Sequence, residues 1–280
     1  MAKLLEGRIV AEKIREEIRQ KAQNLKQKPV LASILIGDNP GGVSYVKSQE
    51  NVANMVGVTY NLYKPDNNIG EVQLIDFIHK LNADKGINGI IVQAPLPQHI
   101  DYKKISGHIS AQKDVEGMHP LNMGQLFFGK TQIAPCTASA VMELLDYSGI
   151  DLYGKEAVVV GHSEIVGKPL VLLLLERFAT VTICHIATTK AGNLKEHVQQ
   201  AEVLVVAVGQ AGLIKGEWIK KGAIVVDVGI NHRNGKIVGD VEFESAVKRA
   251  SYITPVPGGV GPLTATILMR NLVETAILQQ

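Results

Sequence analysis

The sequence predicts an α/β fold built in two halves, the second of them of the Rossmann type. Three observations predict this class. Short apolar segments alternate with longer amphipathic ones, the alternation restarts after a helix in the middle of the chain, and a glycine-rich turn follows the first strand of the second half. Strands that alternate with helices form parallel sheets through right-handed crossovers. We therefore expect parallel sheets in both halves.

Composition excludes several other classes of protein. The chain has 280 residues, of which 46% are hydrophobic and 20% charged, and a chain of this length buries roughly 75% of its unfolded surface. Disorder and a disulfide-stapled miniprotein are excluded. The net charge is +2 and the basic residues are spread along the chain, so we expect no nucleic-acid or membrane partner. The apolar runs fall far short of the ~20 residues that span a bilayer, and with no signal-peptide pattern at Met1 we expect a cytoplasmic protein.

In the first half, residues 8–27 form the first predicted helix, with Ile9, Val10, Ile14 and Ile18 as one apolar stripe. Pro29 ends it. The elements that follow are a buried strand over 30–36, a helix over 42–56, a strand over 58–63, a helix over 70–82 and a strand over 90–93. Pro95 and Pro97 end the last strand.

In the second half, Pro135-Cys136-Thr137 opens a helix to about 148, with proline in its first turn, and we expect this helix to connect the halves. Strands are predicted over 157–160, 180–184, 203–208 and 223–228, with helices over 165–176 and 192–201 between them. The two cysteines, Cys136 and Cys184, have no metal-site or disulfide spacing, and no metal is expected.

The turn after the strand 157–160 reads Gly161-His162-Ser163-Glu164-Ile165-Val166-Gly167. Glycines here let the backbone approach a pyrophosphate at a helix N-terminus, as in the Rossmann fingerprint. The alternative is that the glycines end the strand for packing reasons alone. The next strand ends Cys184-His185, without the acid typical of NAD sites or the arginine typical of NADP sites. His162 is the nearest candidate to contact an adenosine phosphate, and the choice between NAD and NADP stays open.

Near the C-terminus, Thr254 to Pro262 is dense in glycine and proline. One interpretation is that the backbone of this loop lies against a flat ligand. The alternative is that the loop only leads into a helix and binds no ligand.

Several of these segments together resemble the methylenetetrahydrofolate dehydrogenase/cyclohydrolase family. They are Tyr45-Val46 with Gly57, residues 91–97, Lys113-Asp114-Val115-Glu116-Gly117, Pro135-Cys136-Thr137, the 161–169 turn and Thr254 to Pro262. The resemblance implies a homodimer whose subunits have two α/β domains around a cleft. Residues 1–138 plus 264–280 would bind folate and carry the catalytic site, and residues 139–263 would bind NADP, the family's usual cofactor, or NAD. The last helix, 263–278, would pack back on the first domain.

The resemblance also implies the site residues. Catalytic roles would fall to Tyr45, Gln49, Gln93 and Glu116. The tetrahydrofolate substrate would contact Tyr45, Gln93, Pro95, Leu96, Glu116, Pro257, Gly258 and Gly259. The dinucleotide would contact Cys136, Thr137, Gly161, His162, Ser163, Ile165, Val166, His185, Gly209, Gly229, Ile230, Gly258 and Thr264.

The sequence departs from the family pattern at the tyrosine motif. The family has Y-x-x-x-K, whereas this chain has Gln49 four residues after Tyr45. Lys47 is about 200° round the helix from Tyr45 and cannot replace the lysine. Gly42 stands where serine is usual, and Glu116 where aspartate is usual.

The family oxidises 5,10-methylenetetrahydrofolate and then hydrolyses the methenyl product to 10-formyltetrahydrofolate. Hydride transfer needs alignment of the reacting atoms, whereas hydrolysis needs a group that moves protons, typically worth 10²–10⁴-fold. An amide does not titrate, so we expect a dehydrogenase of one-carbon metabolism with an impaired cyclohydrolase step. The alternatives are a fully bifunctional enzyme that uses another route, neutral drift at single positions, a changed pterin-like substrate, and a non-catalytic paralogue.

Overall fold

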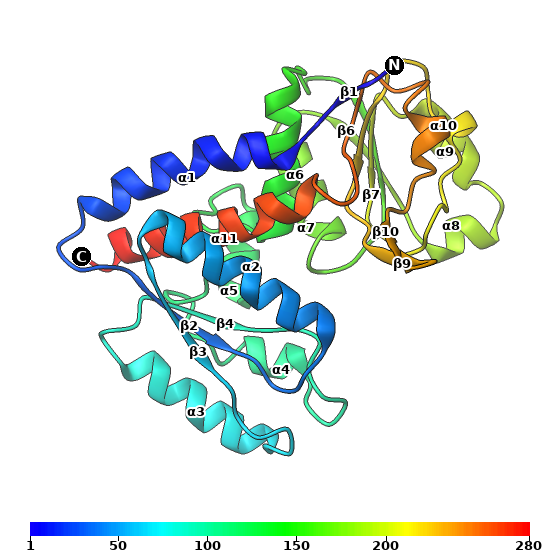
Figure 1. Ribbon diagram of the computed structural model, residues 1–280. Helices are drawn as coiled ribbons and strands as arrows, with labels where there is room; N and C mark the ends of the chain where they lie inside the picture. The colour runs from blue at the N-terminus through cyan, green and yellow to red at the C-terminus, as the bar shows by residue number, and fades with distance from the viewer. The chain divides into compact units, whose positions relative to one another are not determined.

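The computed structural model describes residues 1–280, which divide into two compact units (Figure 1). The six-stranded unit comprises Met1–Ala11 and Thr137–Thr264, and the three-stranded unit comprises Glu12–Cys136 and Ala265–Gln280. The sequence expectation placed the first residues with the folate-binding half. The structure places them in the six-stranded unit, because β1 (Lys3–Leu4) pairs in parallel with β11 (Tyr252–Ile253).

The three-stranded unit is built on a parallel sheet in the order β3-β2-β4. Its strands are β2 (Val30–Ile34), β3 (Thr59–Tyr63) and β4 (Gly89–Val92), and its helices are α2 (Pro40–Val56), α3 (Glu71–Ala83), α4 (Tyr102–Ser106), α5 (Pro120–Phe127), most of α1 (Gly7–Gln23) and most of α11 (Val260–Leu278). Each predicted strand and helix of this half is present, with ends shifted by a few residues. The short helices α4 and α5 were not predicted.

The two faces of this sheet differ in polarity. Side chains alternate along a strand, so Ala32 and Ile34 of β2 join Leu74 and Ile78 of α3 in one apolar cluster. Ser33 points to the opposite face and is fully buried there. A buried hydroxyl in an otherwise apolar strand requires a polar partner, and this face carries the polar site described below.

Local sequence explains where α2 begins and ends. Asn39 accepts hydrogen bonds from the backbone N–H of Gly41 and Gly42, and Pro40 occupies the first turn. Gly57 ends the helix in the left-handed conformation with φ 80°. The buried positions Gly42, Val46, Gln49, Val52, Ala53 and Val56 follow a helical stripe. Gln49 therefore lies in the middle of the face that α2 buries.

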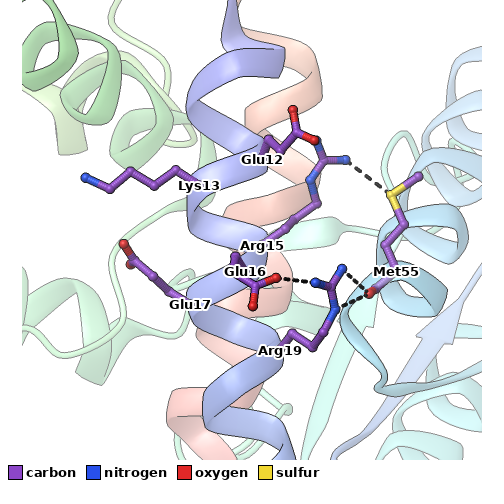
Figure 2. Close-up of a pocket in the computed structure, with 7 residues that line it drawn as sticks. All are labelled: Glu12, Lys13, Arg15, Glu16, Glu17, Arg19 and Met55. Carbon is purple, nitrogen blue, oxygen red and sulfur yellow. Dashed lines mark hydrogen bonds and ion pairs between the residues drawn. The ribbon is translucent and has the colours of Figure 1, made fainter.

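An arginine on α1 caps the far end of α2. The Arg19 guanidinium donates two hydrogen bonds, of 3.1 and 3.0 Å, to the backbone carbonyl of Met55, and it also pairs with Glu16 (Figure 2). The surrounding pocket of about 640 Å³ is lined by Met55 and by charged side chains of both signs on α1, namely Glu12, Lys13, Arg15, Glu16, Glu17 and Arg19. Arg15 and Arg19 both bond to Met55, so the pocket lies where α1 meets α2.

The last helix completes the three-stranded unit. Asn271 of α11 donates hydrogen bonds to the carbonyls of Val115 and Ala134, at 2.9 and 3.2 Å. Glu274 pairs with Lys21 of α1. These contacts hold residues far apart in the chain in one folded unit.

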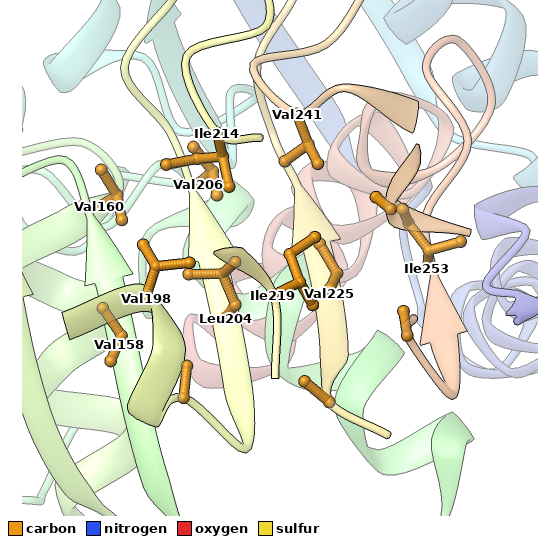
Figure 3. Close-up of a cluster of buried hydrophobic side chains, with 14 of the residues drawn as sticks. Val158, Val160, Val198, Leu204, Val206, Ile214, Ile219, Val225, Val241 and Ile253 are labelled. Carbon is orange, nitrogen blue, oxygen red and sulfur yellow. The ribbon is translucent and has the colours of Figure 1, made fainter. Parts of the chain in front are cut away.

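The six-stranded unit has a fully parallel sheet in the order β1-β11-β8-β7-β5-β6. Its elements are α6 (Cys136–Ser148), β5 (Glu156–Val160), α7 (Gly167–Leu175), β6 (Thr180–Cys184), α8 (Ile186–Lys190), α9 (Leu194–Gln200), β7 (Val203–Val206), β8 (Ile224–Asp227), the antiparallel hairpin β9 (Asn231–Arg233) and β10 (Lys236–Val238), and α10 (Phe243–Ala246). Valine, leucine and isoleucine from these strands and α9 form its core (Figure 3).

The order of these strands sets a switch point. From β5 the chain proceeds to β6 on one side and then to β7 on the other. In such sheets a ligand site lies outside the carboxyl ends of the strands at this point. In this sheet the loops after β5 and β7 lie at that point. No helix in the structure is long and apolar enough to cross a bilayer.

Candidate active site

Gln49 is the central residue of a polar network inside the three-stranded unit. Its side chain is fully buried, whereas Lys47 two residues earlier is exposed. The Gln49 and Gln93 amides bind each other twice, with Nε2 of Gln49 3.2 Å from Oε1 of Gln93 and Nε2 of Gln93 2.8 Å from Oε1 of Gln49. Lys47 is therefore unable to replace the family lysine at this position.

Two hydroxyl groups complete the network. The Tyr60 hydroxyl lies 2.9 Å from Oε1 of Gln49 and 2.8 Å from Oγ of Ser33. Nε2 of Gln93 also donates to Oγ of Ser33, at 2.9 Å. The four side chains come from α2, β3, β2 and the residue after β4. Burial raises the pKa of Tyr60 to about 12, so its hydroxyl stays protonated at neutral pH.

Tyr45 lies one helical turn before Gln49 on α2. Burial raises the pKa of the Tyr45 phenol well above its usual value, and the neighbouring Gln49 side chain works in the opposite direction. Tyr45 is thus a neutral phenol at neutral pH.

Glu116 lies near Tyr45 but bonds outside the Gln49 network. Its Oε2 accepts a 3.2 Å hydrogen bond from the hydroxyl of Tyr102. Burial, with the nearby Asp114 carboxylate, raises the pKa of Glu116 to about 8. A glutamic acid with this pKa is largely protonated at neutral pH, and it can donate as well as accept a hydrogen bond.

Asp114 has a supporting role beside Glu116. It accepts the backbone N–H of Glu116 at 3.1 Å, the backbone N–H of His119 at 2.7 Å and Nδ2 of Asn122 at 2.8 Å. These bonds hold the 114–119 turn in place. Lys113 is also structural, because its ammonium donates to backbone carbonyls at the end of α3.

The remaining substrate and thiol candidates of this unit are placed as follows. Pro95 is exposed directly after Ala94, and Leu96 packs against the apolar cluster beneath α3. Cys136 is buried with its sulfur 3.5 Å from the Val115 carbonyl oxygen, and burial raises the pKa of this thiol. Cys136 therefore belongs to the core of the three-stranded unit.

In the six-stranded unit, the turn after β5 is built by close backbone approach. Gly161 has φ 126°, and a Cβ on it would lie 2.3 Å from the carbonyl oxygen of Ala207 in the loop after β7. A Cβ on Gly167 would lie 2.0 Å from the carbonyl oxygen of Gly161. Ser163 accepts the Val166 N–H at 3.2 Å. The glycines are thus required to close the turn at the switch point.

Two imidazoles stand beside this turn. The rings of His162, which is exposed, and His185 have centroids 5.1 Å apart. Nδ1 of His185 accepts the backbone N–H of Ala187, which leaves Nε2 to carry the proton. Both residues follow neighbouring strands, His162 after β5 and His185 after β6.

A buried carboxylate holds the loop after β7. Asp240 accepts the backbone N–H groups of Val208, Gly209 and Gln210 at 2.7, 3.0 and 2.7 Å, and Nδ2 of Asn231 at 2.8 Å. Gly229 leaves room for this carboxylate, since a Cβ there would lie 2.2 Å from its Cγ. Ile230, the next residue, is exposed.

A second carboxylate, Asp227, supports the same region. It accepts the backbone N–H groups of Gly229, Asp240 and Val241 at 3.0, 3.0 and 2.9 Å. Burial raises its pKa to about 6. The predicted cofactor residues Gly209, Gly229 and Ile230 are therefore positioned by two acids that the sequence reasoning missed.

The C-terminal glycine-rich loop binds the start of α1. The Gly7 N–H donates to the Gly258 carbonyl at 3.0 Å. Pro257 is exposed and Gly259 is buried. Thr264 bonds to the Val260 carbonyl within its own helix, and Thr137 is half-buried in α6. No group of three or more His, Cys, Asp or Glu side chains is arranged to hold a metal ion.

Sequence reasoning also missed Ser33, Tyr60 and Tyr102. Ser33 gave a usable signal as the polar residue of an apolar strand. The two tyrosines gave none, because nothing local in the sequence says that β3 and α4 bring their hydroxyls to Gln49 and Glu116.

The whole chain matches known proteins. The family models for the catalytic domain and the NAD(P)-binding domain of tetrahydrofolate dehydrogenase/cyclohydrolase match residues 5–116 and 135–280. The bifunctional protein FolD of Bacillus pumilus is 48% identical over 279 residues, covering 98% of both chains.

Solved structures agree with these matches. The bifunctional enzyme FolD-methylenetetrahydrofolate dehydrogenase/cyclohydrolase from Campylobacter jejuni is 44% identical with a TM-score of 0.96, covering 100% of both chains. The Trypanosoma brucei methylenetetrahydrofolate dehydrogenase-cyclohydrolase, solved with NADP cofactor and an inhibitor, is 38% identical with a TM-score of 0.94, covering 99% of this chain and 98% of that one. The chain belongs to the tetrahydrofolate dehydrogenase/cyclohydrolase family, whose members are NAD(P)-dependent enzymes.

Proposed function

We propose that this protein is a 5,10-methylenetetrahydrofolate dehydrogenase whose cyclohydrolase step is impaired. It transfers a hydride to NAD(P) and forms 5,10-methenyltetrahydrofolate. The observation that carries the proposal is that the Gln49 side chain is buried and hydrogen-bonded within the protein. At the position of the family's lysine stands a fully buried amide that is hydrogen-bonded to Gln93 and Tyr60.

The hydride step needs positioning from this chain and no proton transfer. The departing hydride leaves a carbon flanked by two nitrogens, whose lone pairs stabilise the cation that forms. When bound, the nicotinamide accepts the hydride. Tyr45 would offer its phenol to the folate ring and Glu116 its carboxyl group, while Gln93 would hold the neighbouring Gln49 amide in place. A preorganised set of this kind supplies the alignment that hydride transfer requires.

The six-stranded unit fits a dinucleotide. A side chain at Gly161 would collide with the backbone of Ala207, and one at Gly167 with the backbone of Gly161, so only glycines let this turn close. This turn opens α7 at the switch point of the sheet, which suits a pyrophosphate. His162 and His185 would lie toward the adenosine end, and the Val208–Gln210 loop that Asp240 holds would line the same site.

The ring-opening step needs a side chain that can take up and release protons, and Gln49 cannot do this. Water must lose a proton as it attacks the methenyl carbon, and a ring nitrogen must gain one. The Gln49 amide does not titrate, and the raised pKa values of Tyr45 and Tyr60 keep both phenols neutral. The missing acid/base group removes a factor of about 10²–10⁴ from this step.

One observation favours a second candidate, a fully bifunctional enzyme. Glu116 lies near Tyr45, and its pKa of about 8 suits proton transfer near neutral pH. If Glu116 moves the proton in place of lysine, hydrolysis persists in the wild-type enzyme and is lost in Glu116→Gln.

The test is a paired assay of the purified protein with methylenetetrahydrofolate and either NADP or NAD, in which reduced cofactor and methenyl compound are recorded together. Reduced cofactor with methenyl compound that disappears only at its spontaneous rate supports the proposal. Rapid enzyme-dependent loss of the methenyl compound supports the bifunctional candidate. No reduction with either cofactor would indicate a changed substrate or a non-catalytic role.

The homodimer implied by the family resemblance and the cytoplasmic location expected from the sequence stay predictions. A sedimentation measurement of the purified chain tests the first, and fractionation of the native cells tests the second.

A further inference from the structure

We propose that Tyr102 is a positioning residue that holds the Glu116 carboxyl group in place for a bound folate. The inference rests on the proposed dehydrogenase function, in which Glu116 offers this carboxyl group to the folate ring, and it adds a residue from α4. The Tyr102 hydroxyl is the only hydrogen-bond partner of the Glu116 carboxyl group, and it lies 3.2 Å from Oε2. Tyr102 therefore acts on the reaction through Glu116.

Tyr102 is anchored on its own side of this contact. It is the first residue of α4, whose N-cap Asp101 accepts the backbone N–H of Lys103 at 2.9 Å. The Asp101 N–H donates to Oε2 of Glu71 at 3.0 Å, which ties the start of α4 to the start of α3. Ile105 of α4 is fully buried in the apolar cluster beneath α3. The hydroxyl is thus carried by a helix that is held at both ends.

The backbone of Glu116 is fixed as well. Its N–H donates to Oδ1 of Asp114 at 3.1 Å. The next residue, Gly117, has φ 72°, and a Cβ on it would lie 2.8 Å from the carbonyl oxygen of Ile133. Only the side-chain torsions of Glu116 are left to move its carboxyl group. A hydrogen bond to an anchored hydroxyl restricts these torsions before the substrate binds.

The contact with Tyr102 depends on the length of the glutamate side chain. Aspartate, the residue that the family resemblance gives as usual at position 116, is shorter by one methylene group, or about 1.5 Å. An aspartate carboxyl group on the same backbone would stop short by that length, beyond hydrogen-bonding distance of the Tyr102 hydroxyl. Tyr102 and Glu116 therefore work as a pair.

The hydrogen bond also favours the ionised form of Glu116. A carboxylate accepts a hydrogen bond from a hydroxyl more strongly than a neutral carboxyl group does. The bond therefore lowers the pKa of Glu116, against the larger effects of burial and of Asp114 that raise it to about 8. Tyr45 and Cys136 also lie near Glu116, and burial keeps both of them neutral. Loss of the Tyr102 hydroxyl should thus raise the pKa of Glu116 further.

The first experiment compares Tyr102→Phe with the matched control Tyr63→Phe in the dehydrogenase assay. Tyr63 lies on β3 of the same unit and packs edge-on against Phe77. We expect Tyr102→Phe to lower kcat/KM for methylenetetrahydrofolate about three- to tenfold, the effect of one lost hydrogen bond. The KM for the dinucleotide should be equal in the two variants.

The second experiment measures the pKa of Glu116 by carbon NMR of labelled glutamate side chains, with Glu116→Gln to assign the signal. We expect Tyr102→Phe to raise this pKa by about 0.5 to 1 pH unit and Tyr63→Phe to leave it unchanged. This titration needs no turnover. A structural role of Tyr102 away from Glu116 would not move this pKa.

A double-mutant cycle completes the test. Because aspartate does not reach the hydroxyl, Tyr102→Phe should change kcat/KM less than about twofold in a Glu116→Asp background. An equal loss in both backgrounds, or an unchanged Glu116 pKa in Tyr102→Phe, would overturn the positioning role and leave the proposed function intact. A wild-type enzyme that reduces neither dinucleotide would overturn the proposed function and the role in the reaction with it.

Discussion

The side-chain amides of Gln49 and Gln93 exchange two hydrogen bonds, of 3.2 and 2.8 Å, inside the three-stranded unit. Gln49 comes from the middle of α2, and Gln93 directly follows β4. Both amides are buried and occupied by protein partners. The pair is therefore a rigid platform next to Tyr45 and has no group that titrates near neutral pH.

Restoring a lysine should restore ring opening. Gln49→Lys places an ammonium beside the two acceptors that the Gln49 side chain now contacts, namely Oε1 of Gln93 and the Tyr60 oxygen. We expect enzyme-dependent hydrolysis of methenyltetrahydrofolate to rise about 10²-fold or more. Absorbance of the methenyl compound measures it. The exposed Lys47→Gln is the control and should leave hydrolysis as it is. An unchanged rate in Gln49→Lys would show that this position does not limit the step.

The raised pKa of Glu116 should appear in the stability of the protein. The folded protein binds this proton more tightly than the unfolded chain, so stability falls as pH rises from about 4.5 to about 8, where the Glu116 pKa lies. Glu116→Gln should flatten this fall between about pH 4.5 and about pH 8. Urea unfolding at several pH values measures it, with the exposed Glu12→Gln as control. Parallel pH profiles of wild type and Glu116→Gln would contradict the assignment.

Asp240 should control dinucleotide binding without contacting the substrate. Each carboxylate oxygen of Asp240 now accepts two N–H hydrogen bonds. Asparagine keeps one of these oxygens, so its NH₂ group must face two N–H donors. We expect Asp240→Asn to raise the KM for the dinucleotide about tenfold through the loosened Val208–Gln210 loop. Initial rates at varied dinucleotide measure it. Glu244→Gln, on the exposed surface, is the comparison that should show no change.

His162 should set the preference between the two dinucleotides. An arginine there stays charged and can bind a 2′-phosphate with two parallel hydrogen bonds, whereas an imidazole is a weaker partner. We expect His162→Arg to lower the KM for NADP about tenfold and to leave the KM for NAD unchanged. An equal change for both dinucleotides would place His162 away from the 2′ position.

Arg19 should contribute to stability through the end of α2. Its guanidinium donates twice to the Met55 carbonyl in the last turn of that helix. We expect Arg19→Ala to lower the free energy of unfolding by about 1 kcal/mol. Lys13→Ala, which lines the same pocket, is the matched control in urea unfolding. Equal losses in the two variants would show that the bonds to Met55 contribute nothing measurable.

Much of the fold was predictable from local sequence, since hydrophobic periodicity, Pro40 at the start of α2 and Gly57 at its end are properties of short segments. The longer strands and helices of both halves were predicted in order, whereas β1, α4, α5, α8, the β9–β10 hairpin, α10 and β11 were missed. These elements are short, and pairing or packing with distant segments stabilises them. β1 shows this clearly, because its partner β11 lies some 250 residues later in the chain.

The sequence by itself determined the family resemblance, the glycine turn at 161–167 and the substitution of glutamine for lysine at position 49. The tertiary structure alone decided what Gln49 can do. The hydrogen bonds that its amide makes depend on the groups that surround it, and those groups come from β2, β3 and the end of β4. The same reason applies to Glu116, whose pKa depends on the burial and the neighbours that folding supplies. Hydrogen-bond direction and desolvation arise from contacts between distant segments, and no local pattern in the chain encodes them.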